Sequence, residues 1–221
     1  MDVDYFLQRA KKTRGIGQKT IERLREQLIN SGDIKKKNIE EVGFPDKKYD
    51  VIYADPPWKF ETWSEKGKGR SAEQHYDCQG LEWIKTLPVE KISKENCILF
   101  LWITFPMVNK VEEVMNSWGF EFKGLGFNWV KRNKKSDSWF WGMGYWTRQN
   151  PEVCLIGTKG TPDRKNAGVH SVVDTKIEEH SKKPEEVRSK IDRLMGENTD
   201  KIELFARQQA EGWDCWGNET E

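Results

Sequence analysis

The stretch that decides the fold is Asp50-Val51-Ile52-Tyr53-Ala54-Asp55-Pro56-Pro57-Trp58, an apolar run that leads directly into two prolines and a tryptophan. The apolar run is typical of a buried strand, and the prolines cannot extend it because proline has no backbone donor. Each proline also fixes φ at about −65°, so the carbonyl groups around Asp55 are held rigidly. Open α/β sheets bind ligands at the carboxyl ends of their strands. We therefore expect a functional site at the end of this strand, with an ordinary proline turn as the alternative.

Apolar runs and helical patterns alternate along the rest of the chain. Further strands are predicted at residues 97–103, 126–130, 153–157 and 202–206. Apolar side chains at helical spacing predict two helices, one marked by Val108, Val111, Val114 and Met115, the other by Val187, Ile191 and Leu194. The second helix is expected to begin at Pro184, since a proline in the first turn loses no hydrogen bond. This alternation predicts an α/β fold with a mainly parallel sheet.

The chain has 221 residues, enough for one α/β domain and a small appendage. Residues 1–30 predict a helical hairpin around a glycine turn, and residues 31–48 a lysine-rich linker. Residues 49–221 are expected to form the main domain. Within it, residues 59–76 and 132–150 are polar, aromatic and rich in glycine, so we expect both to be loops over the functional face.

The chain resembles the MT-A70 family of S-adenosylmethionine-dependent N6-adenine methyltransferases, especially its bacterial and phage members. The resemblance covers about residues 49–218, and after the Asp-Pro-Pro-Trp motif it rests on His75-Tyr76, Leu99-Phe100-Leu101-Trp102, Gly144-Tyr145-Trp146-Thr147-Arg148, Gly157-Thr158-Lys159-Gly160, His180-Ser181-Lys182-Lys183-Pro184, Lys201-Ile202-Glu203-Leu204-Phe205-Ala206-Arg207 and Gly217-Asn218. The early catalytic motif and the late cofactor strand follow the permuted order of that family. The resemblance implies a Rossmann-like methyltransferase fold for residues 49–221.

The resemblance implies methyl transfer to the exocyclic amine of adenine, without a metal. That amine is a poor nucleophile, because its lone pair is delocalised into the ring. Asp55 and the carbonyl group of Pro56 are expected to accept its hydrogen bonds from a geometry that Pro57 helps to fix. Trp58 is expected to stack on the base.

The resemblance also implies residues that bind S-adenosylmethionine. Lys183, beside the expected start of a helix, is suited to the carboxylate of the cofactor, and Asp55 to its ammonium group. Glu203 and Arg207 are expected to contact the ribose, and Asn218 the ribose or the adenine. The family often has His-Asn where this chain has Gln209-Ala210, so the ribose contacts of that pair are not carried over.

Nucleic-acid contacts are expected from three other places. Residues 13–24 resemble a helix-hairpin-helix, in which Gly15, Gly17 and Lys19 would approach a phosphate, although an ordinary helix pair fits the pattern equally well. The other expected contacts are His75, Tyr76, Trp146 and Arg148. The aromatic stretch at residues 139–146 predicts either a clamp for a flipped nucleotide or a glycine-kinked hairpin that closes the core.

The charges are balanced, with 37 Lys and Arg against 36 Asp and Glu, a net charge of +1. Any attraction to nucleic acid must therefore come from local basic patches, such as Lys134 and Lys135. DNA is the preferred substrate, because the amino-terminal hairpin resembles a DNA-binding motif. RNA is the alternative within the same chemistry, and a non-catalytic nucleic-acid-binding subunit is the alternative outside it.

Other classes of protein fit the sequence less well. The cysteines, Cys78, Cys97, Cys154 and Cys215, are far apart and form no C-x-x-C pair, which argues against a zinc site or a disulfide framework. No stretch of about 18 apolar residues occurs, and residues 1–15 do not resemble a signal peptide. We expect a cytoplasmic protein of a prokaryotic or phage-infected cell, without membrane contact. Assembly as a homodimer or heterodimer stays open.

Overall fold

The computed structural model describes residues 43–58, 80–144, 146–179 and 182–217. The chain divides into two units, Met1–Phe44 and Pro45–Glu221, and every helix and strand described here belongs to the second. The expected hairpin at residues 1–30, most of the linker at 31–48 and the loop at 59–76 lie outside the described residues.

The second unit is built on a seven-stranded sheet in the order β5-β3-β4-β2-β1-β6-β7. The strands are β1 (Tyr49–Ala54), β2 (Ser93–Ile103), β3 (Glu121–Arg132), β4 (Glu152–Lys159), β5 (Val172–Lys176), β6 (Lys201–Leu204) and β7 (Asp214–Trp216). In this sheet β4 runs antiparallel to both of its neighbours, and all other neighbouring strands are parallel. The predicted α/β fold with a mainly parallel sheet is therefore confirmed.

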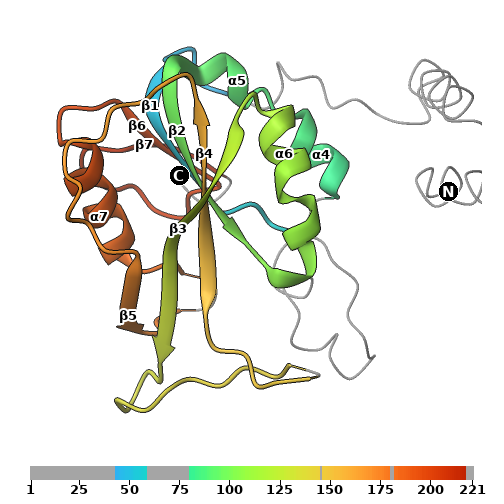
Figure 1. The fold of residues 1–221 in the computed structure, drawn as a ribbon, viewed down its shortest axis with the longest axis vertical. Coiled ribbons are helices and arrows are strands. Elements are labelled where there is room, and N and C mark those ends of the chain that lie inside the picture. Colours follow the sequence, from blue (N-terminus) through green and yellow to red (C-terminus); the bar gives the residue numbers. More distant parts are fainter. Residues whose placement is uncertain (1–42, 59–79, 145, 180–181, 218–221) are drawn as a thin grey trace, which may run out of the picture. The chain divides into compact units, whose positions relative to one another are not determined.

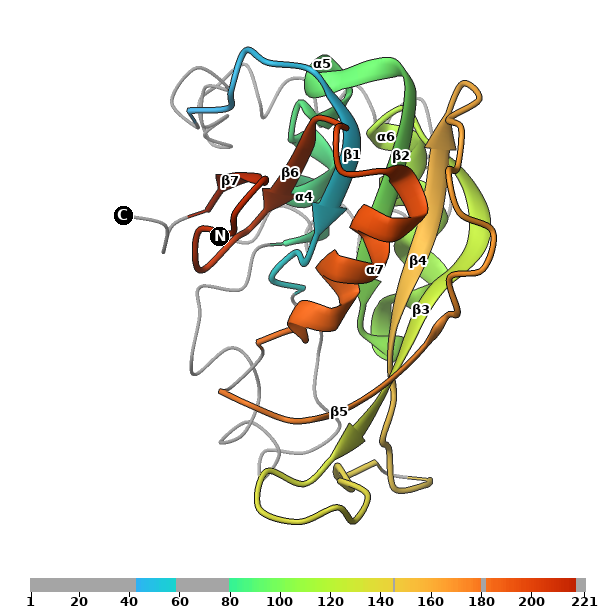
Figure 2. The ribbon, with the colours of Figure 1, turned by 90° about the vertical axis from the view of Figure 1, so that its left-hand side faces the viewer.

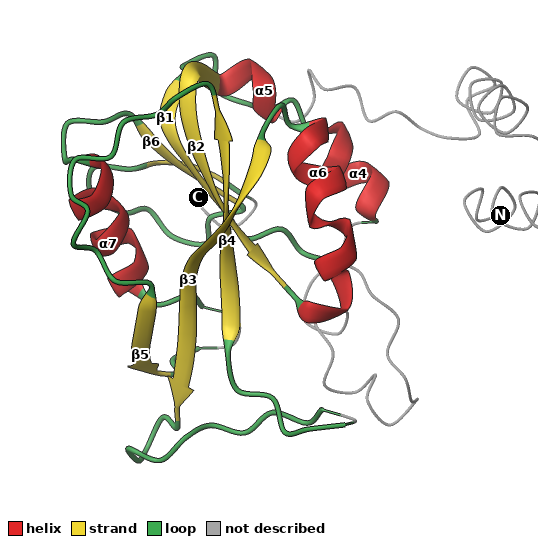
Figure 3. Ribbon diagram, viewed as in Figure 1, coloured by secondary structure: helices red, strands yellow, loops and turns green. Residues whose placement is uncertain are grey.

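Helices cover both faces of the sheet (Figures 1 and 3). They are α4 (Leu81–Thr86), α5 (Val89–Ile92), the 3₁₀ helix η3 (Phe105–Lys110), α6 (Val111–Ser117) and α7 (Glu185–Met195). Helix α7 buries Val187, Ile191 and Met195 in a cluster with side chains of β1, β2, β3 and β4. Helices α4 and α6 lie on the opposite face, where the indole N–H of Trp118 donates to the carbonyl group of Ile84 at 2.8 Å.

The two predicted helices exist, with one error. Helix α7 begins directly after Pro184, as expected, and Val111, Val114 and Met115 form the buried side of α6. Val108, however, is 52% exposed and lies in η3. A 3₁₀ helix has about 3.0 residues per turn instead of 3.6, so the apolar stripe of α6 does not continue backward to Val108. Among the described helices, none is both long and apolar enough to cross a membrane.

The register of the strands brings four strand ends to one edge of the sheet. Ala54, the last residue of β1, lies opposite Leu101 of β2 and Leu204 of β6. Because β4 is antiparallel, its start lies at the same edge, with Val153 opposite Ile103 at the end of β2. We call this the carboxyl edge, and Figure 2 shows β1 and β6 ending there side by side.

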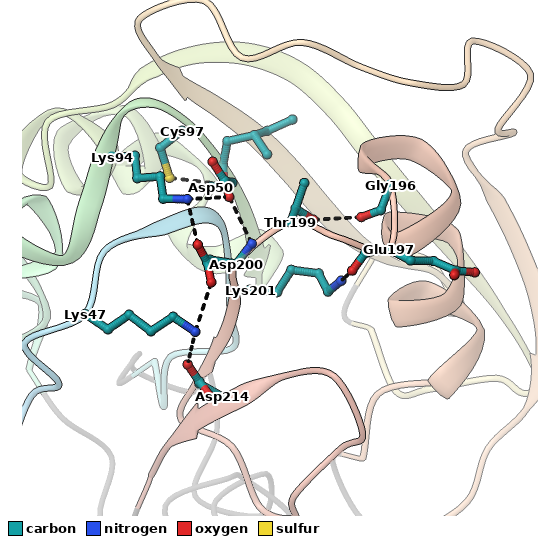
Figure 4. Close-up of polar contacts among 11 residues, drawn as sticks. Lys47, Asp50, Lys94, Cys97, Gly196, Glu197, Thr199, Asp200, Lys201 and Asp214 are labelled. Carbon is teal, nitrogen blue, oxygen red and sulfur yellow. Dashed lines mark hydrogen bonds and ion pairs between the residues drawn. The ribbon is translucent and has the colours of Figure 1, made fainter.

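At the opposite edge, which we call the amino edge, alternating charges join the starts of several strands (Figure 4). Lys94 Nζ lies 2.8 Å from Asp50 Oδ2 and 2.7 Å from Asp200 Oδ2. Lys47 Nζ lies 3.0 Å from Asp200 Oδ1 and 3.0 Å from Asp214 Oδ2. The backbone N–H of Asp200 also donates to Asp50 Oδ2 at 2.9 Å. Each lysine thus bridges two carboxylates.

Candidate active site at the carboxyl edge

The turn after β1 is closed by a short backbone hydrogen bond. The N–H of Trp58 donates to the carbonyl oxygen of Pro56 at 2.8 Å, which makes Pro57 the central residue of a three-residue turn. An inverse γ-turn of this kind needs a central φ of about −75°, close to the value that proline imposes. The carbonyl oxygen of Pro56 keeps a second lone pair that can accept another hydrogen bond. The two prolines therefore make a rigid turn with an acceptor, the carbonyl oxygen of Pro56, at its first residue.

Trp58 is anchored at the back of this turn. Its side chain is 4% exposed, and its indole N–H donates to the carbonyl oxygen of Trp102 at 2.9 Å. The indole N–H of Trp102 in turn donates to the hydroxyl oxygen of Tyr53 at 2.7 Å. These two hydrogen bonds connect the turn to the end of β2, so the buried Trp58 supports the turn from behind. Stacking of Trp58 on a base stays a prediction, and it requires the indole face to be uncovered.

Lys183 lies between two carboxylates. Its Nζ is 2.6 Å from Asp55 Oδ2 and 3.4 Å from Glu152 Oε2, and 5.4 Å from the centre of the Trp102 ring. Burial alone would lower the pKa of Lys183, but Asp55 and Glu152 outweigh it and raise the pKa. The ammonium group is therefore charged at neutral pH, and it fixes the orientation of the Asp55 carboxylate.

Glu152 is a site residue that sequence reasoning missed. It is the first residue of β4 and forms ion pairs with both Lys183 and Lys131. Burial would raise its pKa, but Lys183 and Lys131 outweigh this and lower it. In the sequence, Glu152 is a carboxylate directly before the predicted strand at residues 153–157. The start of a strand lies at the carboxyl edge only if that strand is antiparallel to its neighbours, and the sequence does not show this.

Glu203 extends the cluster along β6. It lies opposite Tyr53 of β1, and its Oε2 is 2.8 Å from a guanidinium nitrogen of Arg188, a second residue that sequence reasoning missed. The side chains of Glu203 and Arg188 are 15% and 13% exposed. Burial raises the pKa of Glu203 because it outweighs the attraction of Arg188. A carboxylate that is so poorly solvated is suited to accept hydrogen bonds from a ligand.

The chain turns sharply after β6. Phe205 has a φ of 62°, in the left-handed region that non-glycine residues rarely adopt, and its ring packs 5.4 Å from that of Trp216 and 6.3 Å from that of Trp83. Gly217 then passes so close that a Cβ atom there would lie 2.2 Å from the carbonyl oxygen of Ala206. Backbone strain of this kind persists only where packing enforces it, and it is found most often at functional sites.

Comparison with known proteins decides the family. The sequence pattern of the MT-A70 family matches residues 49–219.

The chain belongs to the MT-A70 family.

Its relatives differ greatly in length. The chain is 35% identical over 193 residues to the type II methyltransferase M.MunI of a Mycoplasma species, with 79% of each chain covered. It is 30% identical over 178 residues to the human N(6)-adenosine-methyltransferase catalytic subunit METTL3, and 30% identical over 175 residues to an MT-A70-like methyltransferase of Medicago truncatula. These alignments cover 28% and 26% of the two longer proteins. The chain thus spans about a quarter of their length.

Membership of the MT-A70 family confirms several predictions. The sheet and helices form the Rossmann-like methyltransferase fold, the chemistry is that of N6-adenine methyltransferases, and the cofactor is S-adenosylmethionine. The residues at the carboxyl edge fit this cofactor. Lys183 can pair with a carboxylate, Asp55 with an ammonium group, and Glu203 can accept bonds from ribose hydroxyls. The part of the chain that the structure describes contains no group of three or more potential metal ligands.

The remaining predicted residues are not all brought to this edge. Arg207 follows the turn after β6 and is half-buried. Trp146 and Arg148 are exposed and lie in the segment between β3 and β4. Six predicted residues lie outside the described ones: Gly15, Gly17, Lys19, His75, Tyr76 and Asn218.

The aromatic stretch at residues 139–146 does not close the core. Trp139, Trp141, Met143 and Trp146 are 42%, 60%, 67% and 90% exposed. The alternative prediction, that this stretch forms a hairpin that closes the core, is therefore wrong.

Proposed function

We propose that this chain transfers a methyl group from S-adenosylmethionine to the N6 amine of adenine in DNA. The observation that carries the proposal is the 2.6 Å contact of Lys183 Nζ with Asp55 Oδ2. It holds an oriented carboxylate beside the rigid turn at Pro56 and Pro57, where two acceptors can meet one amine. Preorganised groups of this kind are usually the largest single contribution to catalysis.

The roles at the carboxyl edge follow from the chemistry of the amine. When bound, the cofactor supplies an electrophilic methyl group on a positively charged sulfur. Asp55 and the carbonyl oxygen of Pro56 would accept hydrogen bonds from the two N–H groups of adenine N6. These hydrogen bonds favour a pyramidal nitrogen, whose lone pair is less delocalised into the ring. The N–C bond would form as the bond between the sulfur and the methyl group breaks, so that the sulfur leaves as a neutral thioether. The amine would give up one proton, for which the Asp55 carboxylate is the acceptor. Lys183 keeps its own proton and holds that carboxylate in place.

The cofactor is assigned to the same edge. Lys183 pairs with its carboxylate and Asp55 with its ammonium group, because opposite charges in a poorly solvated site form strong, short hydrogen bonds. Glu203, Arg207 and Asn218 would contact the ribose and adenine. Arg188 holds the Glu203 carboxylate in position through their 2.8 Å ion pair.

The preference for DNA rests on two arguments. The Mycoplasma type II methyltransferase, a DNA methyltransferase, is of similar length to this chain and aligns over most of it. METTL3, an RNA methyltransferase, and the plant relative are several times longer. The helix-hairpin-helix-like sequence around Gly15, Gly17 and Lys19 is suited to phosphates. His75 and Tyr76 complete the proposed contacts with the target base.

One experiment tests the proposal. The full chain is incubated with isotope-labelled S-adenosylmethionine and with DNA or RNA oligonucleotides of matched sequence, and the nucleosides are then separated. We expect labelled N6-methyladenine from DNA. Label from RNA alone would overturn the DNA assignment. Cofactor binding without label in either nucleic acid would identify a non-catalytic subunit.

A further inference from the structure

The segment between β3 and β4 projects from the carboxyl edge (Figures 1 and 2). We call residues 133–149 the finger; residue 145 lies outside the described residues. Because β3 ends and β4 begins at this edge, both roots of the finger lie beside the candidate active site. Lys131 and Glu152, at the two roots, form an ion pair, and Glu152 also contacts Lys183.

The base of the finger is held by Asn150. Its side-chain Oδ1 accepts the backbone N–H of Lys131 at 2.9 Å, and its Nδ2 donates to the carbonyl oxygens of Lys131 at 2.9 Å and Phe140 at 2.6 Å. Arg132 adds a second brace: it pairs with both oxygens of Asp174 at 2.6 Å and lies 4.3 Å from the centre of the Trp139 ring. The finger therefore leaves the sheet in a defined direction.

The tip of the finger is aromatic and exposed. Trp141 is 60% and Trp146 is 90% exposed. Exposed apolar groups that cluster in this way mark interaction sites. The bridge between Gly142 and Gln149 brings the two sides of the tip together, so one hairpin carries both indoles.

The exposed cations of the finger lie on two turns: Lys134 and Lys135 in the turn at residues 133–138, which returns to Arg132 at Trp139, and Arg148 in the hairpin of the aromatic tip. Lys134, Lys135 and Arg148 are exposed, and the described residues offer them no carboxylate partner. The acidic residue of the finger, Asp137, is paired with Lys176 at 3.0 Å. Lysine is depleted in the cores of protein–protein interfaces. Aromatic rings beside cations are instead the combination that binds single-stranded nucleic acid, because every base has a face to stack and every nucleotide a phosphate.

We propose that the finger binds the nucleotides next to the target adenine, with Trp141 and Trp146 stacked on unpaired bases and with Lys134, Lys135 and Arg148 against phosphates. The proposal rests on the function proposed above and deepens it, since an enzyme that modifies a base must take that base out of the stack. Neighbouring bases that lose a stacking partner can stack on the indoles instead. The finger thus compensates part of the cost of extruding the adenine.

The test compares the full chain with finger variants by fluorescence anisotropy of a labelled single-stranded DNA oligonucleotide that contains adenine. We expect Trp141→Ala/Trp146→Ala to weaken binding about tenfold or more, because stacking contributes roughly 1–3 kcal/mol per base and about 1.4 kcal/mol corresponds to tenfold. The double Phe variant at the same positions keeps aromatic faces and should recover most of the affinity. Phe122→Ala is the matched control, since Phe122 is 43% exposed at the far end of β3.

The salt dependence of DNA binding tests the proposed phosphate contacts. Lys134→Ala/Lys135→Ala should flatten the plot of log affinity against log salt by about 1.4, since each phosphate contact to a single strand contributes about 0.7 to the slope. Lys91→Ala, in α5 near the amino edge, should leave the slope unchanged. Cofactor affinity, measured by calorimetry, should stay the same in all finger variants.

Two results would overturn the finger proposal. One is unchanged DNA affinity in both Trp141→Ala/Trp146→Ala and Lys134→Ala/Lys135→Ala. The other is a change of oligomeric state in the Trp variant, measured by sedimentation, which would mean that the tip contacts a second protein chain. Failure of the proposed function is distinguishable, because the unmodified chain would then methylate no DNA, whatever the finger variants do.

Discussion

The two edges of the sheet are both built from lysines and carboxylates, yet they differ in solvation. At the amino edge (Figure 4), the side chains of Lys47, Asp200 and Asp214 are 51%, 40% and 48% exposed. Hydrogen bonds are the largest influence on the pKa values of Lys47 and Asp200. At the carboxyl edge, Lys183 and Glu203 are 13% and 15% exposed, and burial is the largest influence on each pKa. The same residue types are therefore in two different dielectric environments.

This difference has a functional meaning. Exposed ion pairs are screened by water, and each contributes about 0–1 kcal/mol to stability, so the amino edge acts as a modest clamp between strand starts. Poorly solvated charges interact strongly with whatever reaches them, and they hold little of their own hydration shell. We infer that the amino edge stabilises the sheet and the carboxyl edge binds and reacts. The following predictions separate the two edges.

The largest expected effect is the loss of turnover in Asp55→Ala. Removing a preorganised group at the reacting amine costs on the order of 100-fold or more in rate. Asp50→Asn, five residues earlier on β1, should keep turnover within a few fold, because among the described residues its carboxylate contacts Lys94 and Asp200 of the amino edge. Rates at saturating substrate, together with circular dichroism of both variants, would measure this. Near-native methylation by folded Asp55→Ala would contradict the mechanism.

The next effect concerns cofactor affinity in Lys183→Ala. A lost charge-assisted hydrogen bond costs roughly 1.5–3 kcal/mol, so cofactor binding should weaken by about tenfold or more, with a smaller change in DNA binding. Lys182→Ala is the matched control, since the neighbouring Lys182 pairs with Glu178 at 2.6 Å. Calorimetry of both variants with S-adenosylmethionine measures the difference. Equal cofactor affinity in the two variants would refute the assignment of Lys183.

A smaller effect is expected on stability in Lys94→Ala. This variant removes the cation between Asp50 and Asp200 and leaves two carboxylates close together. We expect the free energy of unfolding to fall by about 1 kcal/mol, with turnover unchanged. Urea unfolding followed by circular dichroism measures the change. A loss of activity larger than the loss of folded protein would show that the amino edge contributes to the chemistry.

The smallest effect is the pH dependence of the amino edge. Hydrogen bonds from Lys94 and Lys47 lower the pKa of Asp200 below 3.8. Its contribution to stability is therefore present above the unfolded pKa and is lost as the pH falls through the lower folded value. The stability gap between the native chain and Asp200→Asn should narrow between pH 7 and pH 3, as thermal melting at both pH values would measure. A constant gap would mean that the ion pairs do not stabilise the fold.

Much of the fold could be predicted from the sequence, because it depends on local patterns. The apolar runs at residues 50–54 and 97–103 are buried strands, and the turn at Pro56 and Pro57 ends β1 at the edge where a site was expected. The strands β5 and β7 were missed. They are short, with five and three residues, and mostly not buried, so they lack the apolar signal.

The direction of a strand could not be predicted in the same way. Apolar content is the same for parallel and antiparallel strands, so nothing in the run at residues 153–157 indicated that β4 is reversed. That reversal is what brings Glu152 to Lys183. Arg188 was missed for a related reason: its partner Glu203 is distant in sequence, and only the packing of α7 against the sheet brings them together.

The reversal of β4 has a consequence for how this enzyme could change over evolution. Adjacent antiparallel strands can be joined by a loop of almost any length at their shared end, and each doubling of loop length costs only about 0.6 kcal/mol. The segment between Arg132 and Glu152 is such a loop, and Asn150 holds its base through hydrogen bonds. It can lengthen, shorten or be exchanged between homologues without a change in the order or direction of the strands. The contacts that the finger makes could therefore be transferred as one continuous segment, while the turn at Pro56 and Pro57 stays as it is.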